Sequence, residues 1–431
     1  MSAWAAVLDA ARPERVGSVS RVRGLGVEVR GLDCAVGDVV SLGDDGIAEV
    51  VAISRGAAQC MPLSSAAGVT VGSPVRTSGG PLRVPVGRAL MGRVLDGLGR
   101  PIDGKGPIAA PLVSLDHGTP SVLGRDRISE PLPLGVRALD TLTSIGRGQR
   151  VGLFAGSGVG KSSLLSMIAR GTEADATVIA LVGERGREVR EFLEDDLGPE
   201  GLARSVVVVS TSDQPAMARI RAAFTATRIA EAFRDEGVHA ILMMDSLTRV
   251  AMAQREIGLS AGEPPATRGY PPSTFSVLAG LLERAGTSRG GSVTGIYTVL
   301  VDGDDHNEPI ADAVRSILDG HVVLDRALAL SGHHPAIDVL GSISRVASKI
   351  TSVPQRAQAT ALRAVLAARR AANDLIDIGA YRSGANPRVD AALANERAIS
   401  AFLTQPLDEQ SPVEESWRRL SALVTDLGGV S

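Results

Sequence analysis

The chain has 431 residues, of which 44% are hydrophobic, 22% charged and 3% aromatic, and its formal net charge is −3. This composition is typical of a globular protein with two or three domains, and it excludes a disordered or fibrous chain. The scarcity of aromatic residues and the lack of an overall positive charge argue against a dedicated nucleic-acid binder. No run approaches 18 consecutive apolar residues, and Cys34 and Cys60 lack metal-ligand spacing. We therefore expect a cytosolic protein in a reducing compartment.

The first part of the chain predicts a short helix and then a β domain. Residues 1–15 carry apolar side chains at helical spacing, which indicates an amphipathic segment that either docks a partner or packs on its own domain. Residues 16–86 contain short valine-rich runs separated by glycines, a pattern that predicts small antiparallel strands in a β-barrel domain.

The rest of the chain predicts an α/β domain followed by helices. Residues 87–353 are assigned to a nucleotide-binding domain, and the Pro-rich passage at 87–134 is interpreted as a linker leading into it. From Gly135 onward, apolar runs alternate with helical patterns, which predicts βαβ units around a mainly parallel sheet. Residues 354–431 have Ala, Arg and Leu at helical spacing and predict a C-terminal helical domain.

The central motif is LFAGSGVGKSS, residues 153–163, which indicates a strand, a glycine-rich turn and a helix. The N–H groups of such a turn and the positive end of the helix form an anion site, so this is a phosphate loop. Lys161 is expected to reach the β and γ phosphates of a nucleotide, and the Ser162 hydroxyl to bind Mg²⁺. The general pattern GxxxxGK[ST] has glycine where this chain has Ala155, a departure that touches only the start of the loop. The residues predicted to bind nucleotide here are Gly156, Ser157, Gly158, Val159, Gly160, Lys161, Ser162 and Ser163.

Two carboxylates follow apolar runs elsewhere in this domain. Asp245 ends the run AILMMD, where the edge of a parallel sheet would place it to hold Mg²⁺. Glu184 lies in VGERGRE after another predicted strand, where it would orient and polarise the attacking water, and Arg185 would neutralise phosphate charge. The charged residues that follow are interpreted as surface ion pairs on a solvated helix face, namely Arg187, Glu188, Arg190 and Glu191.

Arg345 ends the motif SISR near the far end of the domain. In a ring of subunits it could reach a neighbour's γ phosphate as an arginine finger. The residues alone leave this open beside an ordinary salt-bridging arginine.

Together these motifs resemble the hexameric ATPases related to the catalytic subunits of rotary ATP synthases, and within them the flagellar and type III secretion export ATPases. The resemblance covers residues 16–407 and lies in LMGRVLDGLGRPIDG, GLFAGSGVGKSS, ALVGERGREVREF, DSLTRVAMAQREIGL and PPATRGYPPSTF. DLIDIGAYRSGANPRVD, residues 374–390, resembles a C-terminal signature of the export group that synthase β subunits lack. Ala155 is also similar to the export group, whereas synthase β subunits usually have glycine there.

The resemblance implies a RecA-like core and assigns roles to matching residues. Lys161 and Ser162 would bind phosphate and Mg²⁺, and Glu184 would act on water. Arg185, Arg249 and Asp245 fall on active-site positions, with Asp245 as the Walker B aspartate, and Arg345 matches the arginine finger.

Two further residues concern the adenine base. In LSGHHPAID, His334 stands where the family usually has a tyrosine against adenine, and an imidazole covers less area than a phenol ring. Phe402, in FLTQP, is expected to be a second base contact.

The implied function is that of a cytosolic, Mg²⁺-dependent ATPase that forms a homohexamer and drives flagellar protein export. The implied partners are the export-apparatus stator and central coiled-coil stalk proteins, the export gate at the inner membrane, and export chaperones and substrates, with no specific nucleic acid. The implied location is the cytoplasmic face of the inner membrane.

Four alternatives remain at the level of sequence. An injectisome secretion ATPase would carry the same motifs. A synthase catalytic subunit is disfavoured by the C-terminal signature, and a non-catalytic ring subunit by the presence of both Lys161 and Glu184. An RNA translocase would need N-terminal aromatics, but Trp4 is the single aromatic of the first 85 residues.

Overall fold

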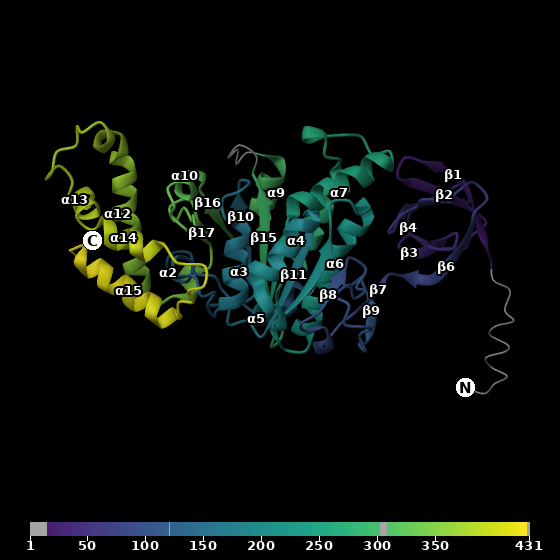
Figure 1. Cartoon of the computed structure of the whole chain (residues 1–431), viewed down its shortest axis with the longest axis horizontal. Coiled ribbons are helices and arrows are strands. Elements are labelled where there is room, and N and C mark those ends of the chain that lie inside the picture. Colours follow the sequence, from purple (N-terminus) through teal and green to yellow (C-terminus); the bar gives the residue numbers. More distant parts are fainter. Residues whose placement is uncertain (1–14, 120, 302–307, 429–431) are drawn as a thin grey trace.

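The computed structural model describes residues 15–119, 121–301 and 308–428. A β-barrel, a sheet covered by helices and a group of helices follow one another along the long axis of the molecule (Figure 1). The predicted amphipathic segment lies outside the described residues except for Arg15.

The N-terminal part is a closed barrel of six strands in the order β1-β2-β5-β4-β3-β6. Alternating small apolar side chains fill it, among them Val27, Val29 and Cys60, so the predicted barrel is confirmed. Cys60 is buried and Cys34 is half-buried, and both are free thiols. The strands are β1 (Gly17–Arg23), β2 (Gly26–Arg30), β3 (Asp38–Leu42), β4 (Gly46–Ser54), β5 (Ala57–Pro62) and β6 (Pro74–Pro81).

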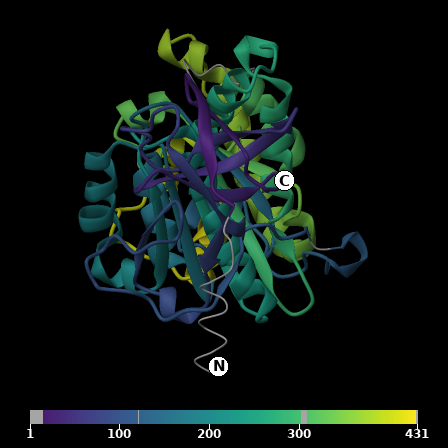
Figure 2. The same ribbon diagram turned by 90° about the vertical axis from the view of Figure 1, so that its right-hand side faces the viewer.

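The central part is a mainly parallel sheet in the order β17-β16-β10-β15-β13-β11-β12-β8, with β14 paired to β15. Only β14 and β17 run antiparallel to their neighbours in this sheet among the residues described. Figure 2 views the molecule with the barrel in front of this sheet. The strands are β8 (Val94–Asp96), β10 (Arg150–Ala155), β11 (Ala176–Val182), β12 (Ser205–Ser210), β13 (His239–Asp245), β14 (Gly286–Thr287), β15 (Ser292–Leu300), β16 (Gly320–Leu324) and β17 (Ile343–Ser344).

The passage at 87–134 is more structured than a linker. Its strand β8 extends the central sheet by pairing with β12, and β9 (Leu112–Ser114) pairs with β7 (Arg83–Pro85). Three-residue strands are too short to show a period in the sequence, which explains why they escaped prediction. Short 3₁₀ turns complete the passage, η1 (Arg88–Leu90) and η2 (Val122–Gly124).

Helices cover both faces of the sheet, because its buried strands are apolar on both sides. In β11, Val178 and Ala180 pack into the core formed with α6, whereas Ile179 and Leu181 pack into the core formed with α3. The helical segments of this part are α2 (Arg137–Leu142), α3 (Lys161–Gly171), α4 (Gly186–Glu191), the π-helical η3 (Phe192–Leu197), α5 (Gly198–Ala203), α6 (Ala216–Asp235), α7 (Leu247–Ser260), η4 (Thr267–Gly269), α8 (Pro272–Glu283), α9 (Pro309–Ile317), α10 (Arg326–Leu330) and α11 (Ala347–Ile350).

The C-terminal part is helical, as predicted. A capping box of Ser352 and Gln355 starts α12, and α15 packs on both α12 and α2. Within the described ranges, no helix combines the length and apolar character needed to cross a bilayer. The helices are α12 (Val353–Asp377), α13 (Pro387–Ala394), α14 (Glu396–Leu403) and α15 (Val413–Asp426).

Candidate nucleotide site

The predicted phosphate loop connects β10 to α3. Gly158 and Gly160 have φ of 76° and 92°, left-handed values that side chains disfavour, and α3 begins at Lys161 directly after them. Ala155 is the last residue of β10, where its carbonyl accepts a hydrogen bond from Val301 at 3.0 Å. Its φ is not positive, so this position does not require glycine.

Three charged side chains meet beside this loop. The Lys161 ammonium donates a hydrogen bond to Asp245 Oδ1 at 2.5 Å and lies 3.7 Å from Glu184 Oε1. Their side chains are 13%, 4% and 15% exposed, respectively. Asp245 ends β13, Glu184 follows β11, and these strands are parallel neighbours, so the fold brings both carboxylates to one edge of the sheet. The carboxyl ends of parallel strands are where open α/β sheets bind ligands.

The pKa of the Glu184 carboxyl group lies above its ordinary value. Its pKa is raised to about 7, chiefly by burial, while the charge of Lys161 opposes this rise and the charge of Asp245 adds to it. No hydrogen bond to Glu184 Oε1 is present among the described residues. A buried carboxylate with one oxygen free of hydrogen bonds and a pKa near neutrality suits proton transfer to or from water.

The two predicted arginines of this region are placed differently. Arg249, on α7, lies against Gly183, since a Cβ built on that glycine would lie 2.8 Å from Arg249 Cβ. Arg249 is therefore packed next to Glu184. Arg185 has an 80% exposed side chain that pairs with Glu188 at 3.5 Å. Exposed pairs follow on the same surface, as predicted, namely Arg187 with Glu191 and Arg190 with Glu194.

Of the two predicted base contacts, one lies at the loop and the other in the core. The Nδ1 atom of His334 lies 3.9 Å from where a Cβ on Gly160 would stand, and His334 is exposed. Phe402 is only 5% exposed and packs among Ile399 and Leu420. Its burial follows from the amphipathic pattern of α14, and the structure gives Phe402 a packing role.

Arg345 lies at the opposite edge of the sheet. It follows β17, whose residue Ser344 pairs with Gly320, the first residue of β16. Its backbone N–H donates to Asp319, and its exposed guanidinium has no partner among the described residues. It therefore cannot act on the phosphate loop of its own chain.

Thr298 belongs to the site but was not predicted. Its hydroxyl donates to Asp245 Oδ1 at 2.8 Å and holds the carboxylate from the side of β15. The available signal was a lone threonine within the otherwise apolar second half of β15, where a buried hydroxyl needs a partner.

A glycine-rich loop before a helix, its lysine and two buried carboxylates at the neighbouring strand ends define an NTP hydrolase of the P-loop class. Comparisons with known proteins narrow this class. Residues 135–344 match the ATP synthase alpha/beta family, nucleotide-binding domain, and residues 351–422 match the T3SS EscN ATPase C-terminal domain.

Individual relatives match along nearly the whole chain. The flagellum-specific ATP synthase of Bacillus subtilis is 52% identical, with 95% of each chain covered. The type 3 secretion system ATPase of Xanthomonas euvesicatoria is 49% identical, with 96% of this chain and 95% of that protein covered. The structure of assembled EscN from enteropathogenic E. coli gives a TM-score of 0.90 at 44% identity, covering 95% of this chain and all of that one. The chain thus belongs to the family of flagellum-specific ATP synthases and type III secretion ATPases, and it is an ATPase.

Proposed function

We propose that this ATPase works as a Mg²⁺-dependent homohexamer that energises protein export through a flagellar type III secretion apparatus. The observation that carries the ATPase part is the contact of Lys161 with Asp245 and Glu184 beside the phosphate loop. The export part is supported by the C-terminal match at 351–422, which distinguishes the chain from a synthase subunit.

In this proposal the loop binds the triphosphate. The backbone amides of residues 156–163 and the Lys161 ammonium contact the phosphates. Ser162 and Asp245 would each supply an oxygen to Mg²⁺, and the bound ion would neutralise phosphate charge. The donor set fits this ion, since Mg²⁺ is usually held by one or two carboxylates with substrate phosphates and waters.

Glu184 then orients water and accepts its proton. Its Oε1 accepts no hydrogen bond and is available for this, and the charge of Lys161, 3.7 Å from that oxygen, favours the ionised form. Arg249 packs on Gly183, the residue before Glu184, and Arg185 is exposed at the start of α4, so both can approach phosphate charge. His334 contacts the base, whereas Phe402 packs in the core.

A ring would complete the site between two chains. Arg345 is exposed and far from its own loop, so it acts as an arginine finger on the neighbour's γ phosphate. A solved structure shows EscN with its central stalk EscO, and this chain matches that EscN at a TM-score of 0.89. We extend the hexamer and a stalk partner to this chain, together with stator proteins, export gate, chaperones and substrates, at the cytoplasmic face of the inner membrane.

The test is deletion of the gene followed by scoring of flagella and swimming. We expect a non-flagellated mutant that the wild-type gene rescues and the Lys161→Ala gene does not. Purified Lys161→Ala protein should show no turnover, and its circular dichroism should match the wild type. A motile, fully flagellated deletion strain would reject the flagellar role.

The second candidate is an injectisome ATPase. The observation in its favour is that the Xanthomonas euvesicatoria relative is nearly as similar as the flagellar ones, at 49% against 52% and 50% identity. Loss of effector secretion with intact motility in the deletion strain would select this candidate.

A further inference from the structure

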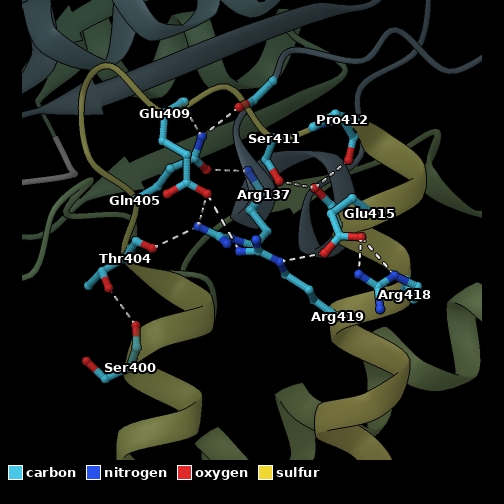
Figure 3. Close-up of polar contacts among 12 residues, drawn as sticks. Arg137, Ser400, Thr404, Gln405, Glu409, Ser411, Pro412, Glu415, Arg418 and Arg419 are labelled. Atoms are coloured by element: carbon cyan, nitrogen blue, oxygen red, sulfur yellow. Dashed lines mark hydrogen bonds and ion pairs between the residues drawn. The ribbon is translucent and has the colours of Figure 1, made fainter.

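Gln405 is a buried amide in the loop between α14 and α15, and it makes an unusually complete set of hydrogen bonds. It is 3% exposed. Its Oε1 accepts from the backbone N–H of Arg137 at 2.9 Å, and its Nε2 donates to the carbonyls of Gly135 and Glu409, both at 2.8 Å. Figure 3 shows Gln405 between Arg137 and Glu409. A buried amide whose polar atoms are all paired fixes the segments it joins.

The main chain of Gln405 holds the residue beside the phosphate loop. Its N–H donates to the carbonyl of His334 at 2.9 Å. The His334 ring lies next to Gly160, with Nδ1 3.9 Å from where a Cβ there would stand. A shift of Gln405 therefore displaces His334 relative to the loop.

The side chain of Gln405 is anchored to the helix that carries the loop. Its partner Gly135 packs on Gly171, because a Cβ built on Gly135 would lie 2.8 Å from the Gly171 Cα. Gly171 ends α3, and the first residue of α3 is Lys161. Gln405 thus links the segment that carries His334 to the segment that packs on the last residue of α3.

Arg137 supports the same loop from the core. It is 2% exposed, and its guanidinium donates to the Thr404 carbonyl at 3.2 Å and to Glu409 Oε1 at 3.1 Å. Arg419 of α15 lies 3.6 Å from the same Glu409 oxygen (Figure 3). These contacts fix both ends of the segment from Thr404 to Glu409, so Gln405 has little freedom to adjust.

We propose that Gln405 is a positioning residue for the base-binding side of the site, where it holds His334 in place beside the phosphate loop. This inference rests on the proposed contact between His334 and the base. The phosphate loop itself is built by β10 and α3 and does not contain Gln405. The affinity for the base therefore depends on Gln405, and the affinity for the phosphates does not.

The sharpest variant is Gln405→Glu, which preserves size and shape. It retains an acceptor for Arg137 but replaces both donated hydrogen bonds with a carboxylate oxygen that faces two carbonyls. The matched control is Gln410→Glu, in the same loop, where the exposed side chain donates one bond to the Arg170 carbonyl at 3.3 Å. Both changes add the same charge within five positions of each other.

The measurement compares binding of MgATP with binding of magnesium tripolyphosphate, which has the phosphates without the base. For Gln405→Glu we expect MgATP to bind about tenfold more weakly, the loss of roughly one base contact, with tripolyphosphate affinity kept within about twofold. KM for ATP should rise while kcat is retained. Gln410→Glu should match the wild type in all four quantities.

Two results would overturn the inference. One is an unchanged MgATP affinity in Gln405→Glu, and the other is an equal loss for MgATP and tripolyphosphate with a lowered Tm, which indicates a purely structural role. His334→Ala separates this inference from the proposed base contact. If His334→Ala binds MgATP normally, the base contact fails and this inference falls with it. If His334→Ala is weakened, adding Gln405→Glu should cause no further loss, and an additive loss would reject action through His334.

Discussion

The two edges of the central sheet carry charged residues in opposite environments. At the carboxyl edge, Lys161, Glu184 and Asp245 are 15% exposed or less and contact one another. At the amino edge, Arg345 is exposed and has no partner among the residues that the structure describes. Buried charges can bind phosphate within one chain, whereas an arginine at the far edge can act only on a neighbour. If Arg345 has the proposed arginine-finger role, each chain carries one half of each of two different sites.

Rings assembled from two different variants test whether Arg345 acts on a neighbouring subunit, and they should give the largest effect. Arg345→Ala alone should lose about 10³ to 10⁵ in kcat, as arginine-finger changes do, and Lys161→Ala should be inactive. A one-to-one mixture should regain up to about a quarter of wild-type activity, because random assembly places an intact loop beside an intact arginine at that share of interfaces.

Steady-state ATPase assays on co-refolded or exchanged subunits provide the measurement. Dilution of wild type with the double variant Lys161→Ala/Arg345→Ala serves as the control for mixing, since a subunit that lacks both groups should lower activity per wild-type chain. If the mixture is no more active than either variant alone while this control shows exchange, Arg345 does not act across the interface.

Glu184→Gln probes the carboxyl edge alone. It should lower kcat about 10² to 10⁴-fold, the usual contribution of a general base, and leave MgATP binding intact. The folded-state pKa of Glu184 is raised to about 7, so the stability it contributes at low pH is lost as pH rises through that value. The uncharged variant should therefore have a higher Tm than wild type at pH about 8. ATP hydrolysis at a wild-type rate would remove Glu184 from the mechanism.

Titration of Glu184 should also be visible in the pH dependence of kcat of the wild-type enzyme, with a smaller effect than the substitution. Because protonated Glu184 cannot accept a proton, kcat should fall about tenfold per pH unit below its pKa, which burial raises to about 7. Single-turnover rates between about pH 5.5 and 8.5 measure this, and MgATP affinity over the same range controls for binding. A profile that is flat through pH 7 would contradict the assignment.

The fold could be predicted largely because its strands are strongly patterned. Valine alternation identified the barrel, and continuous apolar runs such as β11 and β13 identified the buried sheet. The strand order could not be derived, since pairing of β13 between β15 and β11 depends on packing across distant segments. The short strand β8 gave no periodic signal at all.

Within the site, local signals were sufficient for some residues and not for others. Glu184 and Asp245 each follow an apolar run, so their positions at strand ends were evident. Thr298 and Gln405 act through partners 53 and 268 positions away, which no local pattern encodes. Phe402 was expected at the base because of its motif, but the apolar face of α14 buries its ring in the core.

Ala155→Gly should have the smallest effect on stability and on ATP turnover. It tests whether the first residue of the phosphate-loop motif contributes to the site at the carboxyl edge. The residue is 1% exposed, ends β10 and pairs with β15 and β16 on either side, with a backbone conformation that any residue can adopt. Glycine would add freedom to the unfolded chain and remove a packed methyl group, so we expect a loss of about 0.5 to 1 kcal/mol in the free energy of unfolding. ATP turnover should stay within about twofold of wild type, since the left-handed glycines that shape the loop are unchanged. Urea titration and steady-state kinetics on the same preparation measure both quantities. A large change in kcat would mean that this position controls the loop itself, and the alanine would then mark a functional difference from synthase subunits.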